Sequence, residues 1–242
     1  DGGRINVACG STHLEPLQAA VRTHGADVGF AHDGDADRVL AVDERGEVVD
    51  GDALMGICAL DRRARGLLPG DVVVATVMSN AGLEDALRAA GVRLERTRVG
   101  DRYVLERMRE LGAVLGGEQS GHLVFLDHAT TGDGLVTALE VVNVMLRSGR
   151  RLSELRAAIP RYPQVLVNVR VHRRDGVLEA PGVRAAIRAV QGRLRGGGRI
   201  LVRPSGTEPV IRIMVEATRQ EVAEALAAEV AEAVTRAAGA AP

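Results

Sequence analysis

The sequence predicts an α/β protein, with mixed-sheet α/β domains followed by a small α+β C-terminal domain. Through the first 150 residues, short apolar runs typical of strands alternate with segments of helical periodicity. From residue 164 onward the pattern becomes strands accompanied by flanking helices, which is typical of an antiparallel sheet with helices packed on it. The composition agrees, because 242 residues with 46% hydrophobic and 26% charged side chains can bury a sizeable core.

Local signals justify each element in turn. The run VVVATV over residues 72–77 is the clearest strand, and Gly91 and Gly112 end the two helices that follow it. In the final helix, Val222, Leu226, Val230 and Val234 form one apolar face. The predicted elements are, in order, an extended entry over 5–9, a helix over 14–24, strands over 27–31, 39–42 and 47–49, a helix over 52–65, a strand over 72–77, a helix over 83–90, a strand over 92–99, a helix over 103–111, strands over 113–115 and 122–126, a helix over 135–146, a strand over 165–171, a helix over 183–194, strands over 199–203 and 210–216, and the final helix.

The segment DGDADR, residues 33–38, places three aspartates at alternate positions. In an extended strand such residues lie about 7 Å apart, so the segment must curl if Asp33, Asp35 and Asp37 are to bind one cation. Gly34 and the small Ala36 permit that curl. An all-carboxylate site with room for phosphate oxygens suits Mg²⁺.

Three other interpretations of this segment are weaker. An EF-hand loop would have glycine at its sixth position, where this chain has Arg38, and helices rather than strand-like flanks. A phosphatase of the aspartyl-phosphate type uses a lysine, and the chain contains none. An acidic surface turn would carry the repulsion of three neighbouring carboxylates without a reason for it.

Two further polar loops carry chemistry, although each also fits an ordinary turn. RPSGTEP, residues 203–209, offers a cation, two hydroxyls and backbone amides around a glycine, which together suit a phosphate. Pro, Ser and Gly are equally what a hairpin turn requires. GGEQSGH, residues 116–122, offers acceptors and donors suited to sugar hydroxyls. A polar turn explains it as well, and a lone histidine is more often structural than catalytic.

Other features exclude whole classes of function. A net charge of -1 argues against nucleic acid as a partner, because phosphate backbones attract basic surfaces. No apolar run approaches the roughly 20 residues of a membrane span, and the first residues do not resemble a signal peptide. Cys9 and Cys58 lie in apolar settings without metal-like spacing, which favours reduced core residues and a cytoplasmic location.

Taken together and in this order, DGDADR, GGEQSGH and RPSGTEP resemble the α-D-phosphohexomutase superfamily, and the resemblance covers the chain from the aspartate segment onward. It implies an isomerase of carbohydrate metabolism that moves a phosphate between the 6 and 1 positions of a hexose through a bisphosphorylated intermediate. Gln119, with VGDRYV at 99–104 and TTGDG at 130–134, resembles the branch acting on glucosamine phosphates, which supplies cell-wall precursors. The alternatives are a branch acting on mannose or glucose phosphates and a non-catalytic phosphosugar-binding module.

The resemblance also implies roles for individual residues. Asp33, Asp35 and Asp37 would bind Mg²⁺, and Arg38 would stabilise the transferring phosphoryl group. Residues expected to contact substrate are Glu118, Gln119 and Ser120 for the sugar, and Arg203, Ser205, Gly206, Thr207 and Arg212 for the phosphate. Residues expected to position groups or transfer protons are His122, Asp101 and Arg102.

The resemblance implies an organisation as well. Residues 1–50 would be the remainder of the metal-binding domain, 51–150 the sugar-recognition domain, 151–163 a linker and 164–242 the phosphate-binding domain. Superfamily members carry a first domain with a phosphorylated serine in a T-A-S-H-N-P type loop, and this sequence has none; Ser11 lies at a different place in the pattern. The chain is therefore expected to be the C-terminal part of such an enzyme, to bind metal and sugar phosphate weakly, and to show no turnover alone. The oligomeric state stays open.

Overall fold

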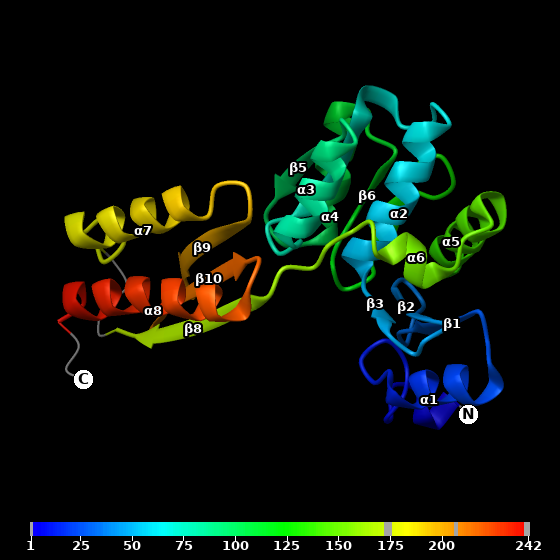
Figure 1. Ribbon diagram of the computed structural model, residues 1–242, viewed down its shortest axis with the longest axis horizontal. Helices are drawn as coiled ribbons and strands as arrows, with labels where there is room; N and C mark the ends of the chain where they lie inside the picture. Colours follow the sequence, from blue (N-terminus) through cyan, green and yellow to red (C-terminus); the bar gives the residue numbers. More distant parts are fainter. Residues whose placement is uncertain (1, 172–175, 206–207, 240–242) are drawn as a thin grey trace. The chain divides into compact units, whose positions relative to one another are not determined.

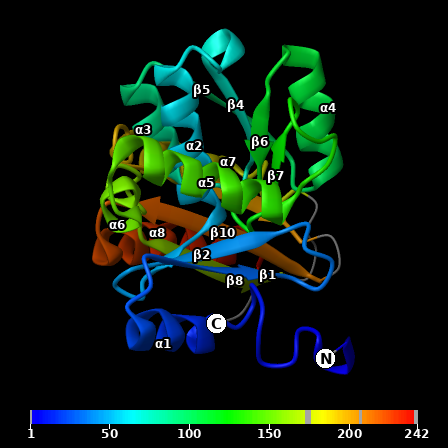
Figure 2. The ribbon, with the colours of Figure 1, turned by 90° about the vertical axis from the view of Figure 1, so that its right-hand side faces the viewer.

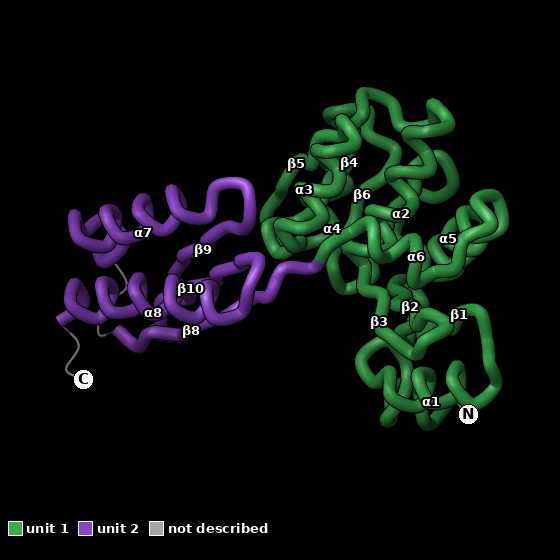
Figure 3. The backbone as a smooth tube through the Cα atoms, viewed as in Figure 1, with its two compact units in different colours: residues 1–160 green, residues 161–242 purple. Residues whose placement is uncertain are grey.

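The computed structural model describes residues 2–171, 176–205 and 208–239, which belong to two compact units, Asp1–Pro160 and Arg161–Pro242 (Figure 3). The first unit contains an antiparallel sheet, a mixed sheet and several helices, and the second contains an antiparallel sheet with two helices. The predicted fold class is confirmed. In the described part of the chain, no helix has the length and apolar character needed to cross a membrane.

The smaller sheet of the first unit is an antiparallel meander. It comprises β1 (Val28–His32), β2 (Val39–Asp43) and β3 (Val48–Val49), in that order. Helix α1 (Glu15–His24) lies beside β1 (Figure 2). Because His32 pairs with Val39, the segment 33–38 is the loop that joins β1 to β2.

The second sheet of this unit has the strand order β5-β4-β6-β7. Strand β4 pairs in parallel with β5 and β6, and β7 closes the edge antiparallel to β6. The strands are β4 (Val72–Thr76), β5 (Arg93–Thr97), β6 (Leu115–Gly117) and β7 (Leu123–Phe125). Every residue of β4 is buried, which explains its uninterrupted apolar run.

Helices pack on both faces of this sheet, so it is doubly wound as expected. Val73 and Ala75 of β4 pack with α2 (Gly51–Ala64) and α3 (Ala81–Ala89), while Val72 and Val74 pack with α4 (Asp101–Leu111). Helix α5 (Gly134–Ser148) joins the α2 side. Asp50, Asn80 and Asp133 cap α2, α3 and α5 by accepting backbone N–H bonds, which satisfies groups that a helix start leaves unpaired.

The segment expected to be a linker is partly packed. It contains α6 (Leu152–Arg156), and Leu152, Leu155 and Ile159 join the main core beside α2. Ser153 also donates to the Glu44 carboxylate through its hydroxyl and its N–H. Within the first unit, β2 and β3 share one core with α2. The change of unit falls at residues 160 and 161.

The entry segment also differs from expectation. Residues 5–9 form turns after a short 3₁₀ helix (Gly2–Arg4), with Asn6 and Ala8 at φ values of 61° and 50°. Such backbone angles are incompatible with an extended strand. Ser11 then anchors the segment by donating its N–H to the His32 carbonyl.

The second unit is a three-stranded antiparallel sheet covered by two helices (Figure 1). Its strand order is β8-β10-β9, with β8 (Gln164–Arg170), β9 (Gly198–Pro204) and β10 (Val210–Ala217). Helices α7 (Pro181–Arg193) and α8 (Gln220–Ala237) pack on it. The predicted apolar face of α8 is confirmed, because Leu226, Val230 and Val234 are buried and Val222 packs beside them.

A core substitution distinguishes a linker from a packed segment. We expect Leu152→Ala to lower the free energy of unfolding of the first unit by about 2–5 kcal/mol, because it removes a fully buried side chain and leaves a cavity. Denaturant unfolding measures this change. Leu146→Ala is the control, since Leu146 is 76% exposed and its truncation should change stability by less than about 0.5 kcal/mol. Equal effects of the two substitutions would contradict the packing of α6.

Candidate functional site

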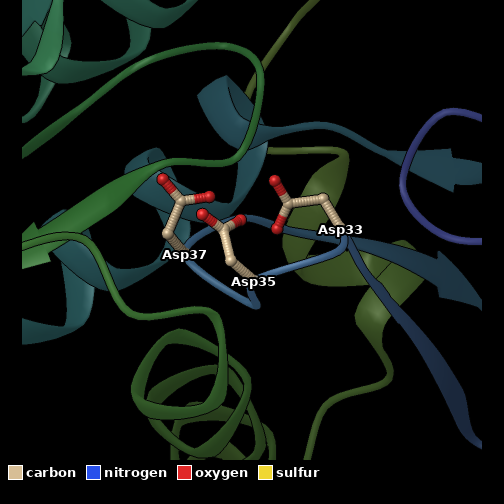
Figure 4. A group of neighbouring side chains, drawn as sticks. All are labelled: Asp33, Asp35 and Asp37. Carbon is tan, nitrogen blue, oxygen red and sulfur yellow. The ribbon is translucent and has the colours of Figure 1, made fainter. Parts of the chain in front are cut away.

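The loop between β1 and β2 gathers the three aspartates. One carboxylate oxygen from each of Asp33, Asp35 and Asp37 lies within 4.8 Å of the other two, and the three side chains extend to the same side of the loop (Figure 4). Ala36 has φ of 59° and donates its N–H to the Asp33 carbonyl at 3.2 Å, so the segment does curl. An all-oxygen donor set of this spacing fits a hard divalent cation such as Mg²⁺.

Arg38 closes the loop on itself. Its Nε lies 2.8 Å from Oδ2 of Asp33 and 3.3 Å from Oδ1 of Asp37, and its N–H donates to Oδ1 of Asp33. Burial alone would raise the pKa of Asp33, but the bond from the Arg38 backbone, a bond with Asp37 and the Arg38 charge outweigh it and hold the pKa below its usual value. Asp33 is therefore ionised at neutral pH, as a metal ligand must be.

The loop between β6 and β7 is fixed by its backbone. Gly51 at the start of α2 donates its N–H to the Gln119 carbonyl at 3.0 Å, and Val39 of β2 donates to the Gly121 carbonyl at 3.1 Å. A Cβ on Gly51 would lie 2.3 Å from the Glu118 carbonyl oxygen, and one on Gly121 would lie 2.2 Å from that of Val39. Both contacts therefore require glycine.

His122 connects this loop to the aspartates. Its Nδ1 lies 3.0 Å from Oδ2 of Asp37, and its side chain is only 7% exposed. The contact joins residues that are 85 positions apart in the chain. The structure thus brings together two of the loops that sequence reasoning singled out separately.

A cleft of about 320 Å³ opens beside Glu118, Gln119 and Ser120. Glu118 is held in place because its Oε1 accepts the Gly100 N–H at 3.1 Å. The volume lies in the range of small-molecule sites. The remaining lining residues are Val99, which begins the VGDRYV motif, and Thr76 and Met78, which sequence reasoning missed. Their signal was their position just at or beyond the carboxyl ends of β4 and β5, where α/β sheets place ligands.

Asp101 and Arg102 make local contacts at the start of α4. Asp101 accepts the N–H of Arg102, and the Arg102 side chain, 78% exposed, pairs with Glu106 at 2.8 Å. The hydrogen bond and charge of Glu106 raise the pKa of Arg102. These contacts do not link either residue to the aspartate loop, although Gly100 just before them binds Glu118.

A buried carboxylate, Asp52, lies in the first turn of α2. Its Oδ2 accepts the Asn80 N–H at 2.7 Å and so ties the first turn of α2 to the segment that contains Thr76 and Met78. Burial raises the pKa of Asp52 to about 7, against the lowering effect of the Asn80 bond. Sequence reasoning missed Asp52, although the DGD pattern at 50–52 repeats the acidic spacing of the first loop.

In the second unit, Arg203 and Arg212 stand directly opposite each other on β9 and β10. Side chains at opposed positions share a face of the sheet, and like charges there repel each other. Glu208 balances part of this charge by pairing with Arg212 at 2.9 Å, and the Ser205 hydroxyl accepts the Glu208 N–H. The expected phosphate-loop residues Gly206 and Thr207 lie outside the described residues. An anion between the arginines would relieve their repulsion.

Three family models match this chain in sequence order. They are the phosphoglucomutase/phosphomannomutase alpha/beta/alpha domain II over residues 8–46, the alpha/beta/alpha domain III over 50–162, and the C-terminal domain over 166–233. The chain therefore belongs to the phosphoglucomutase/phosphomannomutase family, the phosphohexomutases.

Within this family, the chain is similar to proteins named phosphoglucosamine mutase. It is 61% identical over 224 residues to that of Moorella thermoacetica, covering 93% of this chain and 50% of the relative. It is 57% identical over 242 residues to that of Frankia alni, covering 100% of this chain and 53% of the relative. The chain spans about half the length of the curated relatives it matches.

Solved structures show the same fold. A phosphoglucomutase/phosphomannomutase family protein from Burkholderia thailandensis has a TM-score of 0.77 at 24% identity, over 96% of this chain and 51% of that one. The N-acetylphosphoglucosamine mutase of Aspergillus fumigatus, solved with GlcNAc-6P and magnesium, has a TM-score of 0.70 at 25% identity, over 96% and 54%.

The raised pKa of Asp52 makes stability depend on pH. Between pH 3.8 and about 7, the unfolded chain has lost the Asp52 proton while the folded chain keeps it, so this group lowers stability as pH rises. Asp52→Asn removes the effect. We expect the difference in unfolding free energy between this variant and the wild type to grow in favour of the variant from pH 4 to pH 8, by up to about 4 kcal/mol. The melting temperature of the variant should therefore rise relative to that of the wild type over this range. Asp27→Asn, at an exposed position, should show no such trend. A pH-independent difference for Asp52→Asn would contradict the burial argument.

Proposed function

We propose that this chain is the metal-, sugar- and phosphate-binding part of a phosphoglucosamine mutase. In this proposal, the whole enzyme interconverts glucosamine 6-phosphate and glucosamine 1-phosphate through a bisphosphorylated intermediate. The observation that carries it is the 52–61% identity, over nearly all of this chain, to relatives of that name. The contact between His122 and Asp37 supports it, because it places a sugar-type loop beside a metal-type loop.

The proposed cofactor is Mg²⁺, held by Asp33, Asp35 and Asp37. The convergence of the three carboxylates supports this ligand set, and the related fungal mutase was solved with magnesium. When bound, the ion supplies positive charge that polarises the phosphoryl group. Arg38, already oriented by two of the aspartates, would stabilise the charge on the oxygens of that group.

The proposed sugar contacts come from Glu118, Gln119 and Ser120. All three line one cleft, and the bond from Gly100 holds the Glu118 carboxylate before substrate arrives. A prepositioned carboxylate can accept hydrogen bonds from sugar hydroxyls or from the amino group of a hexosamine. Preorganisation of this kind reduces the entropy that binding loses.

The proposed phosphate contacts come from the second unit. Arg203, Ser205 and Arg212, with Gly206 and Thr207, would hold the phosphate that does not react. The opposed arginines support this role, since they keep two cations on one face of the sheet. Planar guanidinium groups bind phosphate oxygens in a bidentate manner.

Proton transfer and the phosphorylated serine complete the proposal. His122 is engaged by Asp37 through Nδ1, which leaves Nε2 as the nitrogen that could exchange a proton; Asp101 and Arg102 remain candidates for positioning. The serine would belong to the part of the relatives that this chain does not match, so the chain alone should show no turnover. We place the enzyme in the cytoplasm.

A metal-ligand substitution tests the reaction and the cofactor together. The assay follows Mg²⁺-dependent conversion of glucosamine 6-phosphate by a protein that contains this chain and the remaining half of its relatives. We expect Asp35→Ala to lower kcat by at least about a hundredfold, because a missing ligand misplaces the charge that stabilises the phosphoryl group. Asp27→Ala, an aspartate outside the loop, is the matched control. Wild-type turnover of mannose or glucose phosphate but not glucosamine phosphate would keep the family and refute this substrate.

A second substitution tests the phosphate site. In the same assay, Arg203→Gln should raise KM roughly 10- to 100-fold with a smaller effect on kcat, because it removes a charge-assisted bond to a phosphate held throughout the reaction. Arg219→Gln, at an exposed position between β10 and α8, is the control for the loss of one positive charge. An unchanged KM in Arg203→Gln would remove this residue from the site.

A further inference from the structure

The turn TTGDG, residues 130–134, contacts the aspartate loop and His122 from a third segment of the chain. Its central glycine, Gly132, is buried against the His122 ring. A Cβ at this position would lie 2.3 Å from both Nε2 and Cε1 of that ring, a distance that real side chains do not tolerate. The ring is almost fully enclosed and its Nδ1 is bound to Asp37. Because Gly132 has no side chain, the His122 ring has room to lie where its Nδ1 contacts Asp37.

The last residue of the turn contacts the backbone of the residues before and after Asp37. Gly134 donates its N–H to the Ala36 carbonyl at 2.9 Å. Besides Nδ1 of His32 at 2.7 Å, a Cβ on Gly134 would meet two carbonyl oxygens, that of Arg38 at 2.8 Å and that of Ala36 at 2.9 Å. These are backbone atoms on either side of Asp37, so an added methyl group would displace the loop that carries the ligand.

The turn itself is firmly held. Asp133 donates its N–H to the Leu123 carbonyl at 3.2 Å, which attaches the turn to β7. The Asp133 carboxylate accepts the N–H groups of Leu135 and Val136, both at 2.9 Å, and so caps α5. The buried Thr137 adds a hydroxyl bond to the Asp133 carbonyl at 2.7 Å. The two glycines are therefore fixed relative to the sheet.

We propose that the 130–134 turn is a positioning element for the metal site: Gly132 seats His122 against Asp37, and Gly134 fixes the backbone around Asp37. The inference rests on the proposed function, because it takes Asp37 as a metal ligand. Groups that hydrogen-bond to a ligating carboxylate orient it, and their loss typically weakens metal binding 10- to 100-fold. The turn thus makes the affinity of a site in the β1–β2 loop depend on residues nearly a hundred positions later in the chain.

Metal binding by the 242-residue chain tests this directly. Mn²⁺ is the probe, because its electron paramagnetic resonance signal distinguishes free from bound ion. We expect Gly132→Ala and Gly134→Ala each to weaken Mn²⁺ binding about tenfold or more. Gly56→Ala is the matched control: it is a buried glycine of the same unit whose added Cβ would lie 2.6 Å from Ile159 Cδ1, within the core and not at the aspartate loop. It should lower the melting temperature and leave Mn²⁺ affinity unchanged. Gly182→Ala, in open space on α7, should change neither.

A double-mutant cycle separates positioning from general damage. His122→Ala alone should weaken Mn²⁺ binding by removing the bond to Asp37, and it also removes the ring that Gly132→Ala would strike. We therefore expect Gly132→Ala to have no further effect on affinity in the His122→Ala background, a strong non-additivity. If Gly132→Ala alone does not fold, the double variant should fold, since the obstructing ring is gone. Additive losses, or a double variant that also fails to fold, would overturn the role assigned to Gly132.

The outcomes also separate this inference from the proposed function. A wild-type chain that binds Mn²⁺, with both glycine variants binding equally well, would overturn the inference and leave the metal site standing. A wild-type chain that binds no Mn²⁺ would refute the metal assignment itself, and the inference with it. Equal weakening by Gly56→Ala would show that any loss of packing disturbs the site and would refute a specific role for the turn.

Discussion

Close approach of peptide groups at glycines is the constraint on which the first unit depends. The 116–122 loop is attached to β2 through Gly121 and to the start of α2 through Gly51, in each case by a backbone hydrogen bond that a side chain would block. These bonds satisfy buried polar groups without using the loop's side chains. Glu118, Gln119 and Ser120 can therefore face the cleft, and His122 can reach Asp37. A rigid backbone thus presents a polar surface assembled from loops that are distant in sequence.

The two units supply different charges to the proposed reaction. The first presents a cluster of carboxylates that needs a cation, with Arg38 as its internal partner. The second presents two opposed arginines that need an anion. In each cluster an internal ion pair balances part of this charge, Arg38 with Asp33 in the first unit and Glu208 with Arg212 in the second.

Sequence patterns predicted the features that depend on residues close together in the chain, such as strands and tight loops. β-branched runs such as 72–77 became strands because their side chains fit a buried pleated sheet, and Gly34 with Ala36 predicted the curled loop. The expectation of a linker over 151–163 came from Arg150-Arg151, Pro160 and Pro163, which interrupt the helical pattern, whereas Leu152, Leu155 and Ile159 within that segment are buried in the core. Thr76 and Met78 could be recognised only by their position at the end of β4, and the contact between His122 and Asp37 had no local signal. They follow from strand order and register, which bring distant segments together only in the folded chain.

Asp52 shows that the site is maintained at a cost in stability. A carboxylate with a pKa raised to about 7 by burial destabilises the fold at neutral pH, and an apolar residue there would avoid that penalty. An apolar side chain could not accept the Asn80 N–H, so the segment that lines the cleft would lose this hydrogen bond to α2. The buried valines, leucines and alanines shared by β4, α2 and α3 provide the stability that offsets this penalty. Asp52 is not among the residues that line the cleft, so it contributes to the cleft through its hydrogen bond to the backbone of Asn80.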